Sequence, residues 1–425
     1  MRMNFTSWRW LLSPSVAILV MLTPLALLSF NLTPGRPLLP LGAPIAVAAV
    51  VVPLLLLAPR LRVPRRQGLQ SFMALWLLPG LVSLASVLWS AQPGLSLQRV
   101  LLVFLPGLAL ITLVACDARP WRTFTLVARA VVATAVVLAL VGIVLLALGQ
   151  TRLTGEGLVQ TFLLGPVQVG QRLVGNPPFL RITSLADNPN GLATWMVFGL
   201  VLLPTAMPDR ERPWPRFLAG LLMVIGLLLT MSRTGMAAVL LALAVYQALR
   251  HPGRVVPLTL AILTVIGGLA VVVMGLRALG FDLTDTDRLT FSLSAREEAW
   301  RPLIEAWRRQ PWTGVGFGVG YEELLRARGL RFGAHSGHLL LLAEIGVLGY
   351  LGVVLVWTRG MFGAVMGSRQ GRLPSRVGAT CAALLAAYFT QQFFEASMLR
   401  FTFASYFWLY LTAVSVLAHK TEDTD

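Results

Sequence analysis

The sequence predicts an all-α integral membrane protein with about twelve transmembrane helices and a long extramembrane loop that contains short helices. Hydrophobic residues make up 56% of the 425-residue chain and charged residues 12%, and the mean hydropathy is +0.75. Soluble domains carry roughly twice this fraction of charged residues. No polar stretch approaches the ~100 residues of a typical soluble domain. We therefore expect residues 1–425 to form a single polytopic membrane domain.

Apolar runs give the expected membrane spans, each near the roughly 20 residues that a spanning helix needs. They are 13–30, 38–58, 71–90, 99–116, 124–148, 191–207, 217–231, 235–249, 255–279, 338–357, 376–393 and 402–418. Arg233 would be costly at membrane depth, so we expect a tight turn around it. The first run is longer than the core of a signal peptide and lacks a clear cleavage site, which favours a retained first helix.

The formal net charge of +17 raises the question of nucleic-acid binding. The basic residues lie mostly in short connections between apolar runs, such as 60–66, 210–216 and 250–254, which is a topology signal and not a nucleic-acid surface. With a cytoplasmic amino terminus, inner segments hold 19 of the 35 basic residues and outer short segments hold five. We therefore predict both termini in the cytoplasm and both long connections, 149–190 and 280–336, on the outer face.

The connection 280–336 is the longest polar stretch, and its arginines balance its acidic residues. Apolar side chains recur at helical spacing after Ser294, which predicts a helix that lies along the membrane or over a cavity and ends by Pro311 and Gly314. A second short helix is expected over 322–328. The connection 149–190, with scattered Gly, Pro and Gln, is expected to be a first outer loop.

The sequence predicts no metal and no cofactor. Cys116 and Cys381 each lie in or beside an apolar run, which argues against a disulfide or thiolate site. The four histidines lack the spacing of a zinc site. Asp282, Asp285 and Asp287 are spaced like calcium ligands, but the segment lacks the required Gly and distal Glu, which favours a solvated acidic turn.

Three arginines are candidates for binding an anion: Arg181, Arg233 and Arg296. Each one alone could reach lipid phosphates from a helix end, or could grip a phosphate or pyrophosphate with its planar fork of donors. The three together favour an anionic ligand. Because the loop 280–336 is net neutral, placement of these arginines and not bulk attraction must do the binding.

Two histidines, His335 and His338, lie three residues apart at the start of an apolar run, on one helix face. Histidine has an unperturbed pKa near neutrality, as a general base requires. The alternative is an interfacial histidine that only forms hydrogen bonds. Trp300, Trp307 and Trp312 are expected to be interface anchors, with a sugar-stacking surface as the alternative.

Four motifs occur in order between residues 177 and 350. They are Arg181 with Asn188-Pro189-Asn190; Ser232-Arg233-Thr234-Gly235; Arg296 and Trp300 followed by Pro311, Gly314 and Gly316; and His335-Ser336 followed by Gly346 and Gly349. Together they resemble the motifs of the bacterial O-antigen ligases, which are related to O-antigen polymerases and protein O-oligosaccharyltransferases. The first five expected helices are similar to that family in character only.

The resemblance implies a GT-C-type fold and an inverting, metal-independent glycosyltransferase of lipopolysaccharide biosynthesis. Such an enzyme transfers O-antigen polysaccharide from undecaprenyl diphosphate to a sugar of lipid A-core. The reaction takes place on the periplasmic side of the bacterial inner membrane. The implied partners are the undecaprenyl diphosphate-linked donor, the lipid A-core acceptor and membrane lipids, with no nucleic acid.

The same resemblance implies roles for individual residues. His335 is the motif histidine and the first candidate for the base, with His338 as the second. Arg181, Arg233 and Arg296 would hold the donor diphosphate, because a cationic group must stabilise the leaving phosphate when no metal does so. Further expected substrate contacts are Asn188, Asn190, Ser232, Arg288 and Trp300.

Three other functions remain open from the sequence. An O-antigen polymerase would share the arginine and histidine motifs. A protein O-oligosaccharyltransferase would also share the histidine motif, but such enzymes tend to carry extra outer soluble regions that this sequence lacks. A lipid-linked oligosaccharide flippase or transporter should place ionisable residues within its helices, and the apolar runs hold few beyond Arg277 and Glu344.

Overall fold

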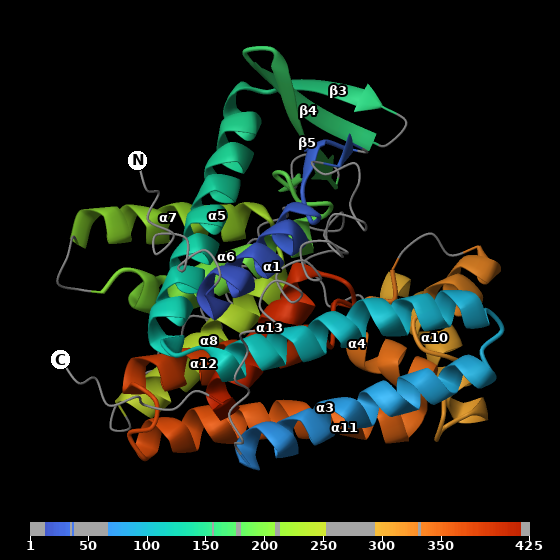
Figure 1. Cartoon of the computed structure of the whole chain (residues 1–425). Coiled ribbons are helices and arrows are strands. Elements are labelled where there is room, and N and C mark those ends of the chain that lie inside the picture. The colour runs from blue at the N-terminus through green and yellow to red at the C-terminus, as the bar shows by residue number, and fades with distance from the viewer. Residues whose placement is uncertain are drawn as a thin grey trace, which may run out of the picture.

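The computed structural model describes residues 13–34, 36–37, 67–154, 157–175, 180–208, 213–251, 294–329 and 333–417. This part of the chain is mostly helical (Figure 1). The expected spans 38–58 and 255–279 lie outside the described residues, as do the acidic turn 282–287 and Arg288.

Every other expected span coincides with a helix. These helices are α1 (Pro14–Leu27), α3 (Gln67–Ala85), α4 (Pro93–Cys116), α5 (Pro120–Leu148), α6 (Pro189–Ala206), α7 (Pro213–Leu229), α8 (Arg233–Arg250), α11 (Gly337–Arg369), α12 (Ser375–Gln391) and α13 (Phe403–Leu417). Within the described ranges, α3 with the turn η3 (Ser86–Leu88), α4, α5, α6 and α11 are long and apolar enough to cross a membrane. The chain is a multi-pass membrane protein, and the count of about twelve spans stays a prediction.

Helix α13 forms the centre of the helical assembly and packs against α11, α4, α12 and α3. Helices α3 and α11 run side by side along one edge (Figure 1). Phe407 of α13 lies 5.0 Å, between ring centroids, from Phe198 of α6, and Trp408 and Tyr410 are also fully buried. Neighbouring helices and not lipid surround α13, and this explains how an apolar helix of only 15 residues is accommodated.

The connection 149–190 forms a four-stranded antiparallel sheet, so the all-α expectation is wrong in this segment. The strands are β3 (Gln150–Thr154), β4 (Gly157–Leu164), β5 (Val167–Val174) and β6 (Arg181–Ile182) in sheet order 3-4-5-6. Gly165, at φ 61°, provides the positive φ that a two-residue hairpin turn needs at its first position. Gln171 Nε2 donates to Gln160 Oε1 at 2.9 Å and to the Gly142 carbonyl of α5 at 3.1 Å, which fixes the sheet on that helix.

A second, two-stranded sheet joins β1 (Asn31–Thr33) to β2 (Arg36–Pro37), and β1 packs beside β5. The segment after α1 therefore meets the sheet that follows α5. Figure 1 shows the β3–β5 hairpins projecting beyond the end of α5, away from the other helices.

The helix expected after Ser294 is confirmed as α10 (Ser294–Arg309), and the expected short helix is confirmed as the π-helical turn η6 (Tyr321–Leu325) with η7 (Arg326–Arg328). Helix α10 packs on α11. Its buried face presents Ala299, Leu303 and Ala306 to Leu325 and Leu340, which together form a small second core. The helical spacing read from the sequence therefore reflects packing on another helix.

Candidate active site

Three helices begin at the same end of the assembly, and each has a side-chain cap at its first turn. Asn188 Oδ1 accepts from the Gly191 N–H at 2.8 Å at the start of α6. Ser232 Oγ accepts from Gly235 N–H, and Ser336 Oγ from Leu339 N–H, both at 3.3 Å. Such caps satisfy backbone donors that a helix leaves unpaired. The expected substrate contacts Asn188 and Ser232 are therefore helix caps in this structure.

Arg181 connects two of these helix starts. Its Nε donates to the Thr230 carbonyl at 2.7 Å, and its Nη2 donates to Asn190 Oδ1 at 2.7 Å. Thr230 belongs to the predicted tight turn between α7 and α8, which the structure confirms, with Met231 at φ 48°. Arg181 thus holds the turn before Arg233 against the first turn of α6. Asn190, an expected substrate contact, hydrogen-bonds Arg181.

Arg296, in the first turn of α10, is the residue around which the other candidates gather. Its positive charge acts on Arg233 and on His335. Its guanidinium lies over the Phe394 ring, 5.2 Å from the ring centroid. An arginine over an aromatic face keeps its planar donor edge free for a ligand. Residues from α8, α10 and the start of α11 are therefore brought together.

His335 precedes α11 in a left-handed conformation, with φ 47°. Its side chain is half-buried, and within the described ranges no hydrogen bond to its ring is present. Burial lowers the pKa of His335, because the charged imidazolium loses hydration, and the positive charge of Arg296 lowers it further. The neutral ring, which can accept a proton, is therefore the favoured form.

His338 is held differently, because it lies in the first turn of α11 whereas His335 precedes the helix; the expectation that both share one helix face is wrong. Its Nε2 is 2.9 Å from the Phe389 carbonyl, and its Nδ1 is 3.0 Å from the Tyr350 hydroxyl. Since a carbonyl can only accept, Nε2 carries the proton and Nδ1 accepts from Tyr350. The ring also packs against Phe393 at 4.3 Å between centroids. Both nitrogens are engaged, which is the arrangement of a structural histidine.

Glu395 belongs to this cluster, and the sequence analysis missed it. It lies in the connection between α12 and α13, where its side chain hydrogen-bonds Asn190 and senses the charges of Arg296 and Arg181. Burial raises its pKa to about 7, against the lowering effects of Arg296, Asn190 and Arg181. Its Oε1 is buried, and no hydrogen bond to it is present among the described residues. The signal in the sequence was one acid in a short connection between two apolar runs.

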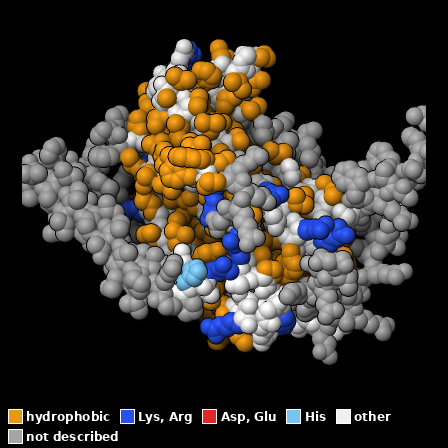
Figure 2. Space-filling model, turned by 90° about the vertical axis from the view of Figure 1, so that its left-hand side faces the viewer, with side chains coloured by type: hydrophobic (Ala, Val, Ile, Leu, Met, Phe, Trp, Pro, Cys, Tyr) orange, Lys and Arg blue, Asp and Glu red, His pale blue; other side chains and the backbone are white. Residues whose placement is uncertain are grey.

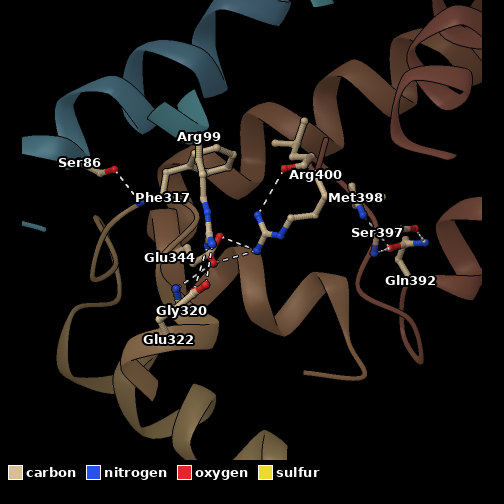
Figure 3. A network of polar contacts seen from close by, with 11 residues as sticks. Ser86, Arg99, Phe317, Gly320, Glu322, Glu344, Gln392, Ser397, Met398 and Arg400 are labelled. Atoms are coloured by element: carbon tan, nitrogen blue, oxygen red, sulfur yellow. Dashed lines mark hydrogen bonds and ion pairs between the residues drawn. The ribbon is translucent and has the colours of Figure 1, made fainter. Parts of the chain in front are cut away.

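The backbone of this connection also holds the histidine segment. The Gly337 N–H, two residues after His335, donates to the carbonyls of Glu395 at 2.6 Å and Gln392 at 2.8 Å. Gln392 Oε1 accepts in turn from the N–H groups of Ser397 and Met398, at 2.9 and 3.0 Å (Figure 3). The connection between α12 and α13 is therefore a fixed support for the start of α11.

The glycines of the third and fourth motifs have a shared structural cause. Gly346 interrupts α11 with φ 62° and ψ −170°, and a side chain there would overlap the backbone of Trp312. The interruption frees helix backbone groups, which pair with the segment after α10. Val347 N–H donates to the Pro311 carbonyl at 2.8 Å, and Gly316 N–H donates to the Glu344 carbonyl at 2.9 Å. This junction fixes α10, and with it Arg296, relative to α11 and His335.

A buried ion pair reinforces the same junction (Figure 3). Arg400 Nη2 lies 2.8 Å from both carboxylate oxygens of Glu344, whose side chain is fully buried, and Glu344 Oε1 also accepts from the Gly320 N–H at 3.0 Å. Nearby, Arg99 of α4 binds Glu322 with two hydrogen bonds of 2.6 and 3.0 Å. Glu344, which the sequence analysis noted as an ionisable residue within a helix, thus pairs with an arginine.

Trp300 lies on α10 beside the cluster, 6.5 Å from Phe394 between ring centroids. Its Nε1 is buried, with no hydrogen-bond partner among the described residues. The ring packs with the second core and its role as a substrate contact stays a prediction, as does that of Arg288, which lies outside the described residues. The described residues contain no group of three or more metal-ligating side chains arranged to hold an ion.

The fold and this cluster describe a multi-pass membrane protein whose helix ends carry arginines, a histidine with a lowered pKa and a buried carboxyl with a raised pKa. Residues 218–354 match the family described as O-antigen ligase, and this match supports the O-antigen ligase family for the chain. The match supports an O-antigen ligase or polymerase type of function in general terms. The matched range includes Arg233, Arg296 and His335, while Arg181 precedes it and Glu395 follows it. Among curated proteins no match is found.

Proposed function

We propose that this protein is an O-antigen ligase that transfers O-antigen polysaccharide from undecaprenyl diphosphate to a sugar of lipid A-core. The transfer is inverting and independent of metal, and the site faces the periplasm with both termini in the cytoplasm of a bacterial inner membrane. The observation that carries this proposal is the position of Arg296, whose charge acts on Arg233, on His335 and on Glu395, while Glu395 also senses Arg181.

In the proposed reaction a hydroxyl of the acceptor sugar attacks the anomeric carbon of the donor. His335 takes the hydroxyl proton, the bond between the anomeric carbon and the phosphate oxygen breaks, and undecaprenyl diphosphate leaves with an added negative charge. A single displacement inverts the configuration at the carbon. The lowered pKa of His335 supports its role as the base, because its ring is neutral at neutral pH.

The arginines place positive charge beside the diphosphate, where negative charge develops as the leaving group departs. Arg233 is exposed at the first residue of α8, and Arg296 keeps its planar edge available over Phe394. Arg181 has two donors engaged with Thr230 and Asn190, so it acts mainly by charge and by holding two helix starts. Fixed cationic donors stabilise a leaving diphosphate better than water does, because they need no reorganisation during the reaction.

We assign Glu395 to the site as a positioning residue. Its carbonyl holds Gly337 and its side chain holds Asn190, so one residue joins the starts of α11 and α6. The carboxyl also moderates the repulsion between Arg181 and Arg296 when no diphosphate is bound. His338, in contrast, is proposed to hold the helix through Phe389 and Tyr350 and to take no proton from substrate.

The test uses the purified full chain in proteoliposomes with lipid-linked polysaccharide and lipid A-core. Capped lipid A-core should form in the presence of EDTA, and loss of product that a divalent ion restores would contradict the metal-independent reaction. The polymer that accumulates in a strain lacking this protein distinguishes a ligase from a polymerase. A ligase deletion leaves long polymer on the lipid carrier and none on lipid A-core, whereas a polymerase deletion leaves no long polymer.

A further inference from the structure

Helices α7, α8 and α12 carry a second group of arginines, Arg216, Arg250 and Arg376, at the end opposite to the candidate active site. Here α6 and α8 end and α12 begins, and a cavity of about 330 Å³ lies between them. Its charged or titratable lining residues are Arg216, Arg250, His251 and Arg376. Tyr246 and Gln247 add polar groups, and no carboxylate is among the described lining residues.

Hydrogen bonds to the protein fix two of these arginines in place. Arg250 Nη1 donates to Ser375 Oγ at 3.1 Å, and Arg376 Nη1 donates to the Pro204 carbonyl at 3.2 Å. A guanidinium has five N–H donors, so one such hydrogen bond orients the side chain without using all of its donors. An arginine that only extends into solvent would need no hydrogen bond to a neighbouring helix.

An apolar groove of about 570 Å³ adjoins the basic cavity, and Arg216 lines both. The groove lies along α7, with Phe217, Gly220, Leu221 and Val224 in its wall. Phe217 is 59% exposed and Leu221 43%, so this face of α7 has no protein covering among the described residues. Figure 2 shows the side of the molecule that is at the left in Figure 1, with basic side chains gathered below a broad apolar surface.

A polar cationic cavity that continues into an apolar groove has the chemistry of an anionic phospholipid. We propose that an anionic glycerophospholipid binds here, with its phosphate on Arg216, Arg250 and Arg376 and an acyl chain along α7. A free phosphate would use the cavity and leave the groove empty. Charge complementarity and the continuity of the two spaces at Arg216 favour the lipid.

This site is distinct from the donor site. Helix α8 has Arg233 at one end and Arg250 at the other, 18 residues in all, which at ~1.5 Å per residue is about 27 Å. A hydrocarbon core is about 30 Å thick, so the two ends of α8 serve opposite leaflets. The proposed phospholipid is therefore in the other leaflet from the proposed glycosyl donor, and its binding does not depend on the ligase reaction.

The test is native mass spectrometry of the full chain in detergent, titrated with phosphatidylglycerol, phosphatidylcholine or inorganic phosphate. Phosphatidylglycerol should bind in preference to phosphatidylcholine. Arg216→Gln should weaken its binding about fivefold, from a contribution of about 1 kcal/mol for each basic residue at a lipid surface. Gly220→Leu should weaken it by narrowing the groove, where a side chain would approach Leu203. Arg372→Gln removes an exposed charge at the same end, outside both spaces, and is the matched control.

Each contrary outcome overturns the proposal. Equal binding of both lipids, or an equal effect of Arg372→Gln, would mean that these arginines contact headgroups without selecting one. If inorganic phosphate at equal concentration displaces phosphatidylglycerol, and Gly220→Leu has no effect on lipid binding, the cavity is a phosphate site. Melting temperatures of the variants, measured without lipid, identify any variant that fails to fold. Arg216→Gln and Gly220→Leu change different walls, so one of them suffices if the other is unstable.

Discussion

Arg181 donates a 2.7 Å hydrogen bond to Asn190, and the Asn190 side chain also hydrogen-bonds Glu395. This chain of contacts joins strand β6, the first turn of α6 and the connection between α12 and α13. Residues separated by more than 200 positions thereby share one polar cluster, and the cluster includes charges of both signs.

His335 and His338 should respond differently to substitution. His335→Ala should abolish transfer in the proteoliposome assay with little change in melting temperature, because no described residue bonds its ring. His338→Ala should lower the melting temperature, because it removes hydrogen bonds to Phe389 and Tyr350, while folded protein keeps measurable turnover. An active His335→Ala enzyme beside an inactive, stable His338→Ala enzyme would reverse the two roles.

Arg233→Lys should impair transfer, because one ammonium group does not reproduce the planar fork that grips a diphosphate. We expect a higher KM for the lipid-linked donor and a lower kcat, measured by product formation at varied donor. Arg309→Lys is a suitable control, since Arg309 is exposed in the last turn of α10, away from Arg296 at its start. Unchanged kinetics in Arg233→Lys would mean that Arg233 only reaches lipid phosphates.

The pH dependence of transfer should shift when the positive charge of Arg296 is removed. The lowered pKa of His335 places the acid limb of the kcat/KM profile, which reports the free enzyme, below the ordinary histidine value of about 6.5. Arg296→Gln removes the nearby positive charge, so the pKa should rise and the acid limb should move to higher pH. Arg296→Lys keeps the charge and should leave the limb in place. An unmoved limb in Arg296→Gln would exclude His335 as the titrating base.

Glu395 should make stability depend on pH. Its folded pKa of about 7 exceeds the unfolded value of about 4.3, so the folded state keeps a proton that the unfolded state releases. Stability is therefore lost as pH rises from about 4.3 through about 7. Glu395→Gln should reduce the fall in melting temperature between pH 5.5 and pH 8.

The same variant also tests positioning at the active site. An amide can still hydrogen-bond Asn190, so Glu395→Gln should retain folded protein, yet above about pH 7 the two arginines lose the counter-charge that ionised Glu395 supplies. We expect a changed KM for the donor and a changed pH profile. A pH profile and KM identical to those of the unmodified enzyme would limit Glu395 to a role in packing.

The junction between α10 and α11 should depend on glycine at position 314. Gly314 has φ 65°, and a side chain there would overlap the backbone of Glu344. Gly314→Ala should cost more than the roughly 1–3 kcal/mol of a strained backbone position, because the overlap adds to it. Gly329→Ala is the control, since Gly329 has φ 77° but open space around it. Equal losses of melting temperature would show that the close packing contributes nothing.

The buried pair of Glu344 and Arg400 should be strongly coupled. Removing either partner of a buried pair leaves an uncompensated charge and costs about 3–5 kcal/mol. We expect Arg400→Gln to lower the melting temperature sharply and Glu344→Gln/Arg400→Gln to recover part of the loss. Additive losses in the double variant would show that the two residues do not act as a pair.

Much of the helical framework could be predicted because its cause is local. Long apolar runs satisfy their own backbone hydrogen bonds as helices, and this places each described span on a helix, although α11 continues to Arg369, twelve residues beyond the expected end at 357. The caps Ser232 and Ser336 also lie just before their helices in the sequence. The sheet over 150–182 was missed because its strands lack the alternation of buried and exposed residues that marks a half-buried strand, although Gly165-Pro166 between two apolar runs was a usable turn signal.

The membrane-embedded helical class, the family resemblance and most of the candidate residues can be read from the sequence, since these depend on composition and on short motifs. What those residues do locally follows from folding. It placed Ser232 and Asn188 in caps, engaged both nitrogens of His338, and brought Glu395 to Arg181 and Arg296. The reason is physical: burial, charge and hydrogen-bond partners depend on neighbours that folding supplies from distant parts of the chain.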